Sequence, residues 1–431
     1  MNPLAIELNE IIKKNPKLFS MLSPLGKKLY FPKGLLSQGA EAKQKAKKFN
    51  ATIGIATENQ VPMHLECINK YFSNLNPEDI FTYAPPSGKL ELRQRWREKI
   101  LKDNPSLKGK NFSLPIVTNA ITHALSITAD LFVEGGDKII LPDKIWGNFR
   151  LIFEIRRKAE ISQYPLFDQK GGFNISGLEE ILDQYKNLEK LIILLNFPNN
   201  PTGYSITKSE ATELVKIFKR VTDKGQNLVV ICDDAYFGLF YEEDILKESL
   251  FAQIANLSNN LLAVKADGAT KEQFVWGFRT GFITLACGNS DKTVYDALEK
   301  KVMGCIRGAI SNCSHPSQTI ILNALNSPDF EKQQKEKYAI LKERALKVKE
   351  VLKSDRYEGA WDVYPFNSGY FMCLRLKNVD AEKLRIHLLD KYGLGVIALG
   401  KSDIRVAFSC LELESIQEVF DTIYSGIIDL T

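Results

Sequence analysis

Apolar runs of strand length alternate with amphipathic stretches through the middle of the chain. The runs are rich in Ile, Leu and Val, and the stretches between them carry apolar residues at helical spacing. They predict strands at 113–119, 138–142, 159–165, 190–196, 228–234, 260–266 and 280–287. Strands that alternate with helices favour a mainly parallel sheet covered by helices on both faces, because each parallel connection crosses back over the sheet. The pattern therefore predicts an α/β fold.

The pattern changes after about residue 315. Long charged helical stretches at 330–354 and 380–392 alternate there with short strands near 368–376 and 404–409, which predicts a second, smaller α+β domain. Residues 1–50 are polar and Lys-rich around short apolar clusters, and they predict helices and loops.

Local signals predict two helices of the middle region. Leu, Trp and Ile recur at helical spacing among charged residues over 90–101, which is typical of an amphipathic helix. Thr207 and Glu210 have the spacing of a capping box, so a second helix is expected to begin near Thr207.

The composition is that of an ordinary globular protein. The chain has 431 residues, enough for two domains with substantial cores, and is 44% hydrophobic and 25% charged. Its net charge of +5 is small for this length and no basic tract occurs, so neither a nucleic-acid nor a membrane partner is predicted. The start lacks the long apolar core of a signal peptide, and no apolar run approaches membrane-spanning length.

Cysteine and histidine usage predicts neither disulfides nor a metal site. The seven cysteines are odd in number, form no CxxC pair and lie mostly in apolar runs, which favours buried, reduced thiols in a cytoplasmic protein. The four histidines are scattered without an HExxH pattern. No GxGxxG follows the first strand and no GxxxxGK[ST] occurs, so a dinucleotide or P-loop site has no support.

One octapeptide is the most informative segment of the chain. It reads Asn196-Phe197-Pro198-Asn199-Asn200-Pro201-Thr202-Gly203. Two prolines and a glycine force an extended turn after a predicted strand, and asparagine amides are left at the strand's carboxyl end. Open α/β sheets keep their ligand sites at such ends. The alternative is an ordinary loop, since Asn, Pro and Gly dominate turns.

Charged residues follow the next two predicted strands. Asp233 comes after an apolar run, where a carboxylate is costly without a positive partner; a helix cap or a solvated loop acid is the alternative. Lys271 follows the strand at 260–266, and Arg279 lies eight residues further on. Such a lysine is either a surface residue or, with an arginine at fixed distance, an imine-forming amine near an anion site.

Together these motifs resemble the fold-type I pyridoxal-phosphate aminotransferases of class I/II, and within them the aspartate/aromatic group. The octapeptide, Asp-x-Ala-Tyr at 233–236 and Lys-x7-Arg at 271–279 occur in the family's order and approximate spacing. The resemblance covers about residues 50–410. It implies a large domain with a mainly parallel seven-stranded sheet, a small α+β domain built from both termini, and a homodimer with shared active sites. It also implies ping-pong transfer of an amino group between an L-amino acid and a 2-oxo acid.

The resemblance suggests how the chain is divided. We assign 1–70 to the N-terminal part of the small domain, 71–315 to the large pyridoxal-phosphate-binding domain and 316–431 to the C-terminal part of the small domain.

The resemblance further implies which residues contact the ring of pyridoxal 5'-phosphate. Lys271 resembles the lysine that bonds to the cofactor and then moves the substrate proton, and Asp233 resembles the acid paired with the ring nitrogen. Asn200 and Tyr236 resemble the donors to the ring's phenolate oxygen. Trp146 resembles the aromatic that stacks on the ring, although a Trp in an apolar core is the alternative.

The cofactor's phosphate needs several donors. Arg279 offers a fixed bidentate fork. Ala120, Ile121 and Thr122 open a predicted helix, whose main-chain amides and Thr122 hydroxyl would face the phosphate. Tyr83 resembles the tyrosine that reaches the phosphate of the neighbouring subunit.

Three departures from the family pattern bear on this site. Phe149 stands where the family has a histidine that supports the ring-nitrogen acid, so the pKa tuning of Asp233 must differ. Gly268 stands where the family has a serine three residues before the lysine, and Ala120 and Ile121 stand where it often has Ser and Gly. Main-chain donation survives these changes, whereas the side-chain hydroxyls are lost.

The resemblance also implies substrate contacts beside Trp146 and Asn200. Arg405 resembles the arginine that binds the α-carboxylate; on pattern alone, a solvated edge residue is the alternative. Arg307 lies four residues before Ser-Asn, where aspartate-specific members carry the arginine that binds a side-chain carboxylate across the dimer. That match is weaker, because Cys-Ser-His-Pro follows rather than Pro-Pro. The segment ending at Ala56 resembles the one that closes over the substrate.

Two further classes of function stay open. A pyridoxal-phosphate lyase acting at Cβ or Cγ would share the fold and the cofactor residues, and ping-pong kinetics with an oxo-acid acceptor separates it from an aminotransferase. A non-catalytic sensor of the kind fused to a DNA-binding domain is disfavoured, because residues 1–50 lack a clear helix-turn-helix pattern and because Lys271 is retained.

Overall fold

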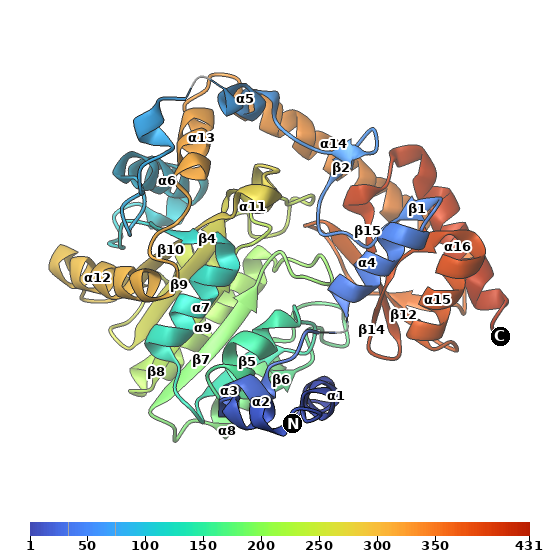
Figure 1. Cartoon of the computed structure of the whole chain (residues 1–431), viewed down its shortest axis with the longest axis horizontal. Coiled ribbons are helices and arrows are strands. Elements are labelled where there is room, and N and C mark those ends of the chain that lie inside the picture. The colour runs from blue at the N-terminus through green and yellow to red at the C-terminus, as the bar shows by residue number, and fades with distance from the viewer. Residues whose placement is uncertain (33, 74) are drawn as a thin grey trace.

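A seven-stranded sheet lies at the centre of the computed structural model, which describes residues 1–32, 34–73 and 75–431 (Figure 1). Its strands are β4 (Ile116–Asn119), β5 (Lys138–Pro142), β6 (Glu160–Tyr164), β7 (Lys190–Asn196), β8 (Asn227–Asp233), β9 (Leu261–Gly268) and β10 (Thr280–Cys287). They lie in the order β4-β10-β9-β8-β7-β5-β6, and only β10 runs antiparallel to its neighbours. The predicted α/β fold class is confirmed, with each predicted strand in place.

Helices surround this sheet because its strands are apolar on both faces. Every residue of β7 after Lys190 is buried, as is every residue of β8 after Asn227, so both faces need cover. The helices of this part are α5 (Glu66–Asn69), α6 (Leu90–Asp103), α7 (Ala120–Phe132), α8 (Ile175–Gln184), α9 (Lys208–Asp223), α10 (Leu250–Ile254), α11 (Ala269–Glu272), α12 (Lys292–Ala309) and α13 (His315–Leu325). The capping box predicted at the start of α9 forms between Thr207 and Glu210.

A second, antiparallel sheet is the core of a smaller α+β unit, on the right in Figure 1. Its strands, in order, are β11 (Trp361–Val363), β12 (Phe371–Leu376), β15 (Asp403–Ala407) and β14 (Ile397–Leu399). Its helices are α4 (Leu35–Lys45), α14 (Phe330–Val351), α15 (Ala381–Tyr392) and α16 (Ile416–Ile428).

Both ends of the chain build this smaller unit. Strand β1 (Phe49–Asn50) pairs with β13 (Leu394–Gly395), and α4 packs beside them. Helices α1 (Pro3–Ile12), α2 (Pro16–Met21) and α3 (Pro24–Lys28) precede α4, and a short hairpin of β2 (Thr57–Glu58) and β3 (Val61–Pro62) follows β1. The exact division at residues 70 and 315 stays a prediction. Within the residues that the structure describes, no helix is long and apolar enough to cross a membrane.

The loop after β7 is fastened to the smaller unit at Gly203. This residue has φ +76°, and a Cβ there would lie 2.0 Å from the carbonyl oxygen of Phe371 on β12. Its own carbonyl accepts hydrogen bonds from the main-chain N–H groups of Asn367 and Ser368, each at 2.9 Å. Only glycine permits both this backbone conformation and this approach.

Candidate active site

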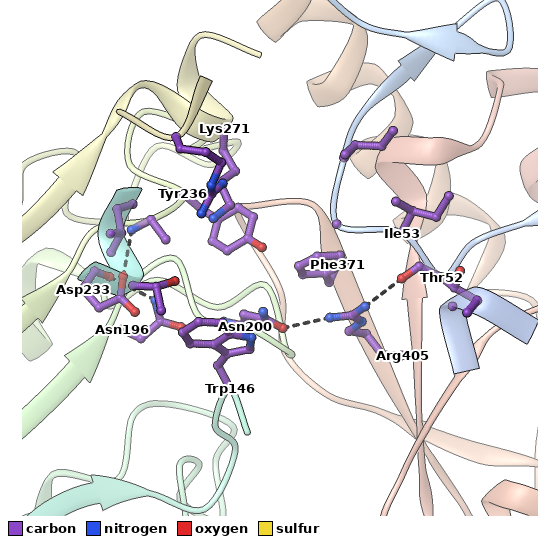
Figure 2. Close-up of a pocket in the computed structure, with 18 of the residues that line it drawn as sticks. Thr52, Ile53, Trp146, Asn196, Asn200, Asp233, Tyr236, Lys271, Phe371 and Arg405 are labelled. Atoms are coloured by element: carbon purple, nitrogen blue, oxygen red, sulfur yellow. Dashed lines mark hydrogen bonds between the residues drawn. The ribbon is translucent and has the colours of Figure 1, made fainter. Parts of the chain in front are cut away.

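A cavity of about 650 Å³ lies between the carboxyl ends of the parallel strands and the four-stranded sheet (Figure 2). Open α/β sheets bind ligands at this place. Lysine, arginine, aspartate and aromatic side chains from both parts of the molecule meet here. The lining residues are Gly39, Ala40, Lys43, Thr52, Ile53, Gly54, Ile55, Ile121, Thr122, Trp146, Asn196, Asn200, Asp233, Ala235, Tyr236, Lys271, Arg279, Phe371 and Arg405.

Lys271 reaches the cavity from α11, which begins directly after β9. Its Nζ lies 5.0 Å from the centroid of the Tyr236 ring. Burial lowers the pKa of Lys271 to about 8, although the carboxylate of Asp233 acts in the opposite direction; Arg279 lowers it further. A lysine with this pKa is about one tenth neutral amine at pH 7, a far larger nucleophilic fraction than an ordinary lysine has.

Lys265, six residues earlier on β9, lies outside the cavity lining. Its side chain is 1% exposed, and its Nζ pairs with the carboxylates of Asp234 and, at 3.2 Å, Asp267. Burial by itself would lower the pKa of Lys265, but the two carboxylates raise it above the ordinary value. Lys265 is therefore a buried ammonium and not a reactive amine.

Asp233 ends β8 beside Asn196, the last residue of β7, with which it is in register. Burial raises the pKa of Asp233 to about 7, even though the ammonium of Lys271 opposes the shift. The main-chain N–H of Ala235 donates to its Oδ1 at 3.2 Å. Phe149, where the family pattern has a histidine, is buried and packs edge-on against Trp146 with ring centroids 5.6 Å apart. Hydrophobic packing of the tryptophan therefore takes the place of a polar contact there.

Asn196 positions two of the predicted site residues, although its role was not foreseen from the sequence. Its Nδ2 donates to the carbonyl of Asp233 at 3.0 Å, and its Oδ1 accepts from the main-chain N–H of Asn200 at 2.8 Å. The first asparagine of the octapeptide thus fixes both strand ends, while Asn200 and Tyr236 line the cavity. Burial raises the pKa of Tyr236, so its hydroxyl stays protonated and is a hydrogen-bond donor.

Arg279 and the start of α7 form the cationic end of the cavity. Arg279 has φ +55°, and its Nη1 donates to the carbonyl of Trp276 at 3.0 Å. Ile121 and Thr122 line the cavity at the helix N-terminus, whereas Ala120, at φ +63°, is buried behind them. An arginine and a helix N-terminus together are suited to a phosphate.

Gly268 does not line the cavity, and the structure gives a steric reason for the absence of a serine. A Cβ at Gly268 would lie 2.7 Å from both the Cα of Gly281 and the carbonyl oxygen of Thr280 on β10. A Cβ at Gly281 would in turn lie 2.6 Å from the carbonyl carbon of Ala120. The two glycines let β9, β10 and the start of α7 approach closely behind the site.

Arg405 enters from β15 on the opposite wall. Its Nη1 donates to Oδ1 of Asn200 at 3.0 Å and its Nη2 to the carbonyl of Thr52 at 2.8 Å, while its Nε is buried without a hydrogen-bond partner (Figure 2). The guanidinium carbon lies 4.0 Å from the centroid of the Phe371 ring. Stacking and two hydrogen bonds thus hold a guanidinium whose remaining donors are available to a carboxylate.

Three further predicted residues, besides Ala120 and Gly268, lie away from the lining. Tyr83 is 89% exposed, and Ala56 is fully buried behind the lining residues 53–55. Arg307, near the end of α12, is exposed and donates to the hydroxyl of Ser311 at 2.6 Å. A role for Tyr83 or Arg307 in this cavity requires a second subunit, whereas Ala56 acts only through its neighbours.

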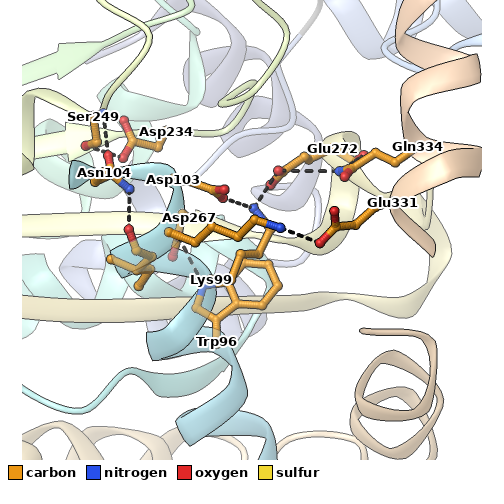
Figure 3. Close-up of polar contacts among 12 residues, drawn as sticks. Trp96, Lys99, Asp103, Asn104, Asp234, Ser249, Asp267, Glu272, Glu331 and Gln334 are labelled. Carbon is orange, nitrogen blue, oxygen red and sulfur yellow. Dashed lines mark hydrogen bonds and ion pairs between the residues drawn. The ribbon is translucent and has the colours of Figure 1, made fainter. Parts of the chain in front are cut away.

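Two ionic clusters, one buried and one partly buried, lie directly behind the site (Figure 3). Asp234 and Asp267 hold Lys265, and the indole N–H of Trp96 donates to Asp267 at 3.1 Å. Lys99 pairs with Glu272 at 2.6 Å, and this acid directly follows Lys271. Asp233 and Lys271 are therefore each followed by an acid that is paired with a lysine; the Asp234–Lys265 pair is buried and the Glu272–Lys99 pair is partly buried.

Several lining residues had no recognisable signal in the sequence. Nothing in the sequence connects Phe371 or Thr52 with Arg405, which contacts both in the structure. Lys43 is one of many lysines in residues 1–50. Asn196 and Ala235 stood in motifs, the octapeptide and Asp-x-Ala-Tyr, which were sufficient signals to include them.

The residues present fit pyridoxal phosphate. The cavity offers an amine of lowered pKa, an acid at the end of β8, an indole beside them and an arginine with a helix N-terminus. Lys271, Asp233 and Trp146 are the groups that would hold the ring, and Arg279 with the start of α7 the phosphate.

Comparison with known proteins agrees with this geometry. A probable aspartate/prephenate aminotransferase of Aquifex aeolicus is 26% identical over 298 residues, covering 67% of this chain and 69% of that protein. An aspartate aminotransferase of Bacillus sp. (strain YM-2) is 24% identical over 248 residues, and this chain spans only 57% of its length. A crystal structure of an aminotransferase from Anaerococcus prevotii superposes with a TM-score of 0.83 at 23% identity, covering 94% of this chain and 98% of that one. The family described as aminotransferase class I and II matches residues 49–423, and the chain belongs to that family.

Proposed function

We propose that this protein transfers an amino group between an L-amino acid and a 2-oxo acid by a ping-pong mechanism, and that it accepts the dicarboxylic substrates aspartate and glutamate. The observation that carries the proposal is that Lys271, an amine of lowered pKa, and Arg405, a guanidinium with free donors, line the same cavity. In an α-amino acid the carboxylate is bonded to Cα, the same carbon that carries the hydrogen to be removed. An arginine for the carboxylate and an amine for the proton must therefore face the same cavity.

Pyridoxal phosphate, when bound, supplies an electron sink for the pair of electrons left at Cα after its proton is removed. Arg405 binds the α-carboxylate and so orients Cα toward Lys271. The neutral Nζ of Lys271 takes the proton from Cα and later delivers it, because its pKa of about 8 lies close to the working pH. Asp233 holds a proton at the ring nitrogen.

The remaining lining residues position the cofactor and exclude water from the cavity. Asn200 and the Tyr236 hydroxyl, which line the cavity, would donate to the ring oxygen of the bound cofactor, and Trp146 would hold its ring. Arg279, with the main-chain N–H groups at the start of α7, neutralises the phosphate. Residues 53–55 cover the cavity from the N-terminal side and exclude water from the reacting atoms.

Two arguments support acidic substrates. The relatives named above include proteins described as aspartate aminotransferases. Arg307 and Tyr83 are exposed in one subunit, and we propose that each acts in the cavity of a second subunit. We accordingly propose a homodimer with shared active sites. All seven cysteines are free thiols, which supports a reducing compartment such as the cytoplasm.

A screen of L-amino acids against the cofactor-loaded protein tests the function. Reaction with an amino donor abolishes the visible absorbance of the lysine-bound cofactor, and a 2-oxo acid then restores it. Parallel lines in double-reciprocal plots with varied donor and acceptor are expected. Release of a Cβ or Cγ substituent without need for an oxo acid would assign the protein to the lyases, and no reaction with any amino acid would favour a sensor.

A further inference from the structure

One positively charged side chain among the described residues of the cavity lining has no phosphate or carboxylate assigned to it in the proposed reaction. Among the described residues that line it, the positively charged ones are Lys43, Lys271, Arg279 and Arg405, and the one acid is Asp233. In the proposed function Arg279 meets the phosphate, Arg405 meets the α-carboxylate and Lys271 is the reacting amine. Lys43 is left over.

Lys43 has no partner within the part of the chain that the structure describes. No ion pair or hydrogen bond of its side chain is present there, and the residue is exposed while it lines the cavity. Lys45, two residues on in the same helix, pairs with Glu41 at 2.9 Å and Asp390 at 3.4 Å. The other lysine of α4 is thus paired with acids, whereas Lys43 is paired with none of the described residues.

Helix α4 is anchored, so that the direction of Lys43 is fixed by the fold. The Gln38 side chain exchanges two hydrogen bonds with the main chain of Ala398, accepting at 2.8 Å and donating at 3.1 Å. Glu41 accepts from Arg385 on α15 at 2.9 Å. These contacts turn one face of α4 toward the small sheet.

The other face of α4 is turned toward the cavity. Gly39, Ala40 and Lys43 lie at i, i+1 and i+4, and all three line the cavity. A Cβ at Gly39 would lie 3.8 Å from Oγ1 of Thr52, whose carbonyl accepts from Arg405. Lys43 stands one helical turn, about 6 Å of rise, from Gly39. The Lys43 side chain thus starts on the same side of the cavity as Arg405.

We propose that Lys43 binds the side-chain carboxylate of a dicarboxylic substrate from within the same subunit, and so determines specificity together with Arg405. This inference rests on the proposed aminotransferase function, because Arg405 there fixes the α-carboxylate. A four- or five-carbon diacid bound to Arg405 would present its second carboxylate to another part of the lining, where Lys43 is the described cation of this subunit that has no assigned anion. Arg307 of a second subunit is a separate source of positive charge.

The test uses two acids without an amino group, so that the cofactor-loaded protein binds them without turnover. Succinate and butyrate both have four carbons and differ in the second carboxylate. Their dissociation constants are measured from the change in the visible absorbance of the lysine-bound cofactor. We expect the wild type to bind succinate more tightly than butyrate, and 0.5 M NaCl to reduce that difference by screening.

Lys43→Met is expected to weaken succinate binding about five- to tenfold and to leave butyrate binding unchanged. Lys43→Arg should retain most of the succinate affinity. Lys45→Met is the matched control, because it removes the same charge from the same helix, and it should alter neither constant.

Three outcomes would overturn the inference: a wild type that does not prefer succinate, a Lys43→Met protein with unchanged succinate affinity, and equal weakening of succinate and butyrate. Loss of the preference in Arg307→Ala but not in Lys43→Met would assign the contact to the second subunit alone. Failure of the proposed function is a different result, since the amino-acid screen would then show no transfer whether or not succinate binds.

Discussion

Arg405 and Asn200 join the two walls of the cavity through a buried hydrogen bond of 3.0 Å from Nη1 to Oδ1. Arg405 belongs to the four-stranded sheet and Asn200 to the loop after β7. The proposed carboxylate clamp and the proposed donor to the cofactor ring are therefore in direct contact. A change at Arg405 should affect every substrate, since all of them carry an α-carboxylate.

Arg405→Ala and Arg307→Ala should distinguish how the α-carboxylate and the side-chain carboxylate of an acidic substrate contribute to kcat/KM. Arg405→Ala is expected to lower kcat/KM for all amino acids by about two or more orders of magnitude, because it removes a buried charge-assisted contact. Arg307→Ala should lower kcat/KM by a similar factor for aspartate and glutamate, and far less for an aromatic or aliphatic amino acid. If the wild type shows no dicarboxylate preference, or if Arg307→Ala retains it, Arg307 has no role in specificity. The general assignment would survive.

Lys271 should carry the cofactor. Reduction of the loaded protein with borohydride, followed by peptide mapping, is expected to place the pyridoxyl group on Lys271. The nearest competitor in sequence, Lys265, is held as a buried ammonium by Asp234 and Asp267, and an ammonium does not attack a carbonyl. A label on Lys265 would contradict both the ionic cluster and the assignment.

Incorporation of the cofactor should depend on pH through Lys271. Its pKa is lowered to about 8, so the neutral amine predominates above that pH. The rate at which cofactor-free protein takes up pyridoxal phosphate should fall about tenfold per pH unit below 8 and level off above it. Asp233→Asn removes the carboxylate that raises this pKa, and so should shift the midpoint to lower pH. A midpoint near 10.5, the ordinary value, would show that burial does not act on this amine.

Asp233→Ala should still bind the cofactor but lose turnover by several orders of magnitude, because the ring nitrogen would no longer keep its proton. Single-turnover measurement of Cα proton exchange into deuterium oxide isolates this step from product release. Near wild-type exchange would mean that Asp234, or no acid, serves the ring nitrogen.

Gly268→Ser should destabilise the protein rather than restore a phosphate contact. The added Cβ would lie 2.7 Å from main-chain atoms of Thr280 and Gly281, which cannot move without displacing β10. Overpacking of this kind costs about 1–3 kcal/mol of unfolding free energy. Denaturant unfolding of cofactor-free protein measures the cost. Gly277→Ser is the control, since a Cβ there meets nothing within 4 Å, and it should be close to neutral.

The elements of this fold could be predicted from the sequence because their signals are local. Seven apolar runs became the seven strands of the central sheet, and the Thr207–Glu210 spacing became the capping box of α9. Motif residues at strand ends, such as Asp233 and Lys271, meet in one cavity because parallel strands share one carboxyl edge.

Long-range contacts could not be predicted in this way. Phe371 stacks on Arg405 across two strands of the small sheet, and α4 reaches the cavity only because Gln38 is bonded to a main chain 360 residues later. Gly268, expected beside the phosphate, instead provides space for Gly281. No property of a residue's own neighbourhood in the sequence encodes such partners.

The close approach of Gly203 to the carbonyl of Phe371 bears on how the two walls of the cavity are spaced. The loop that carries Asn200 is held there against β12 and against the main chain of Asn367 and Ser368. A larger side chain at position 203 would push the loop away from β12, whose neighbour β15 carries Arg405. The distance between the proposed donor to the ring and the proposed carboxylate-binding arginine therefore depends on a glycine that lines neither.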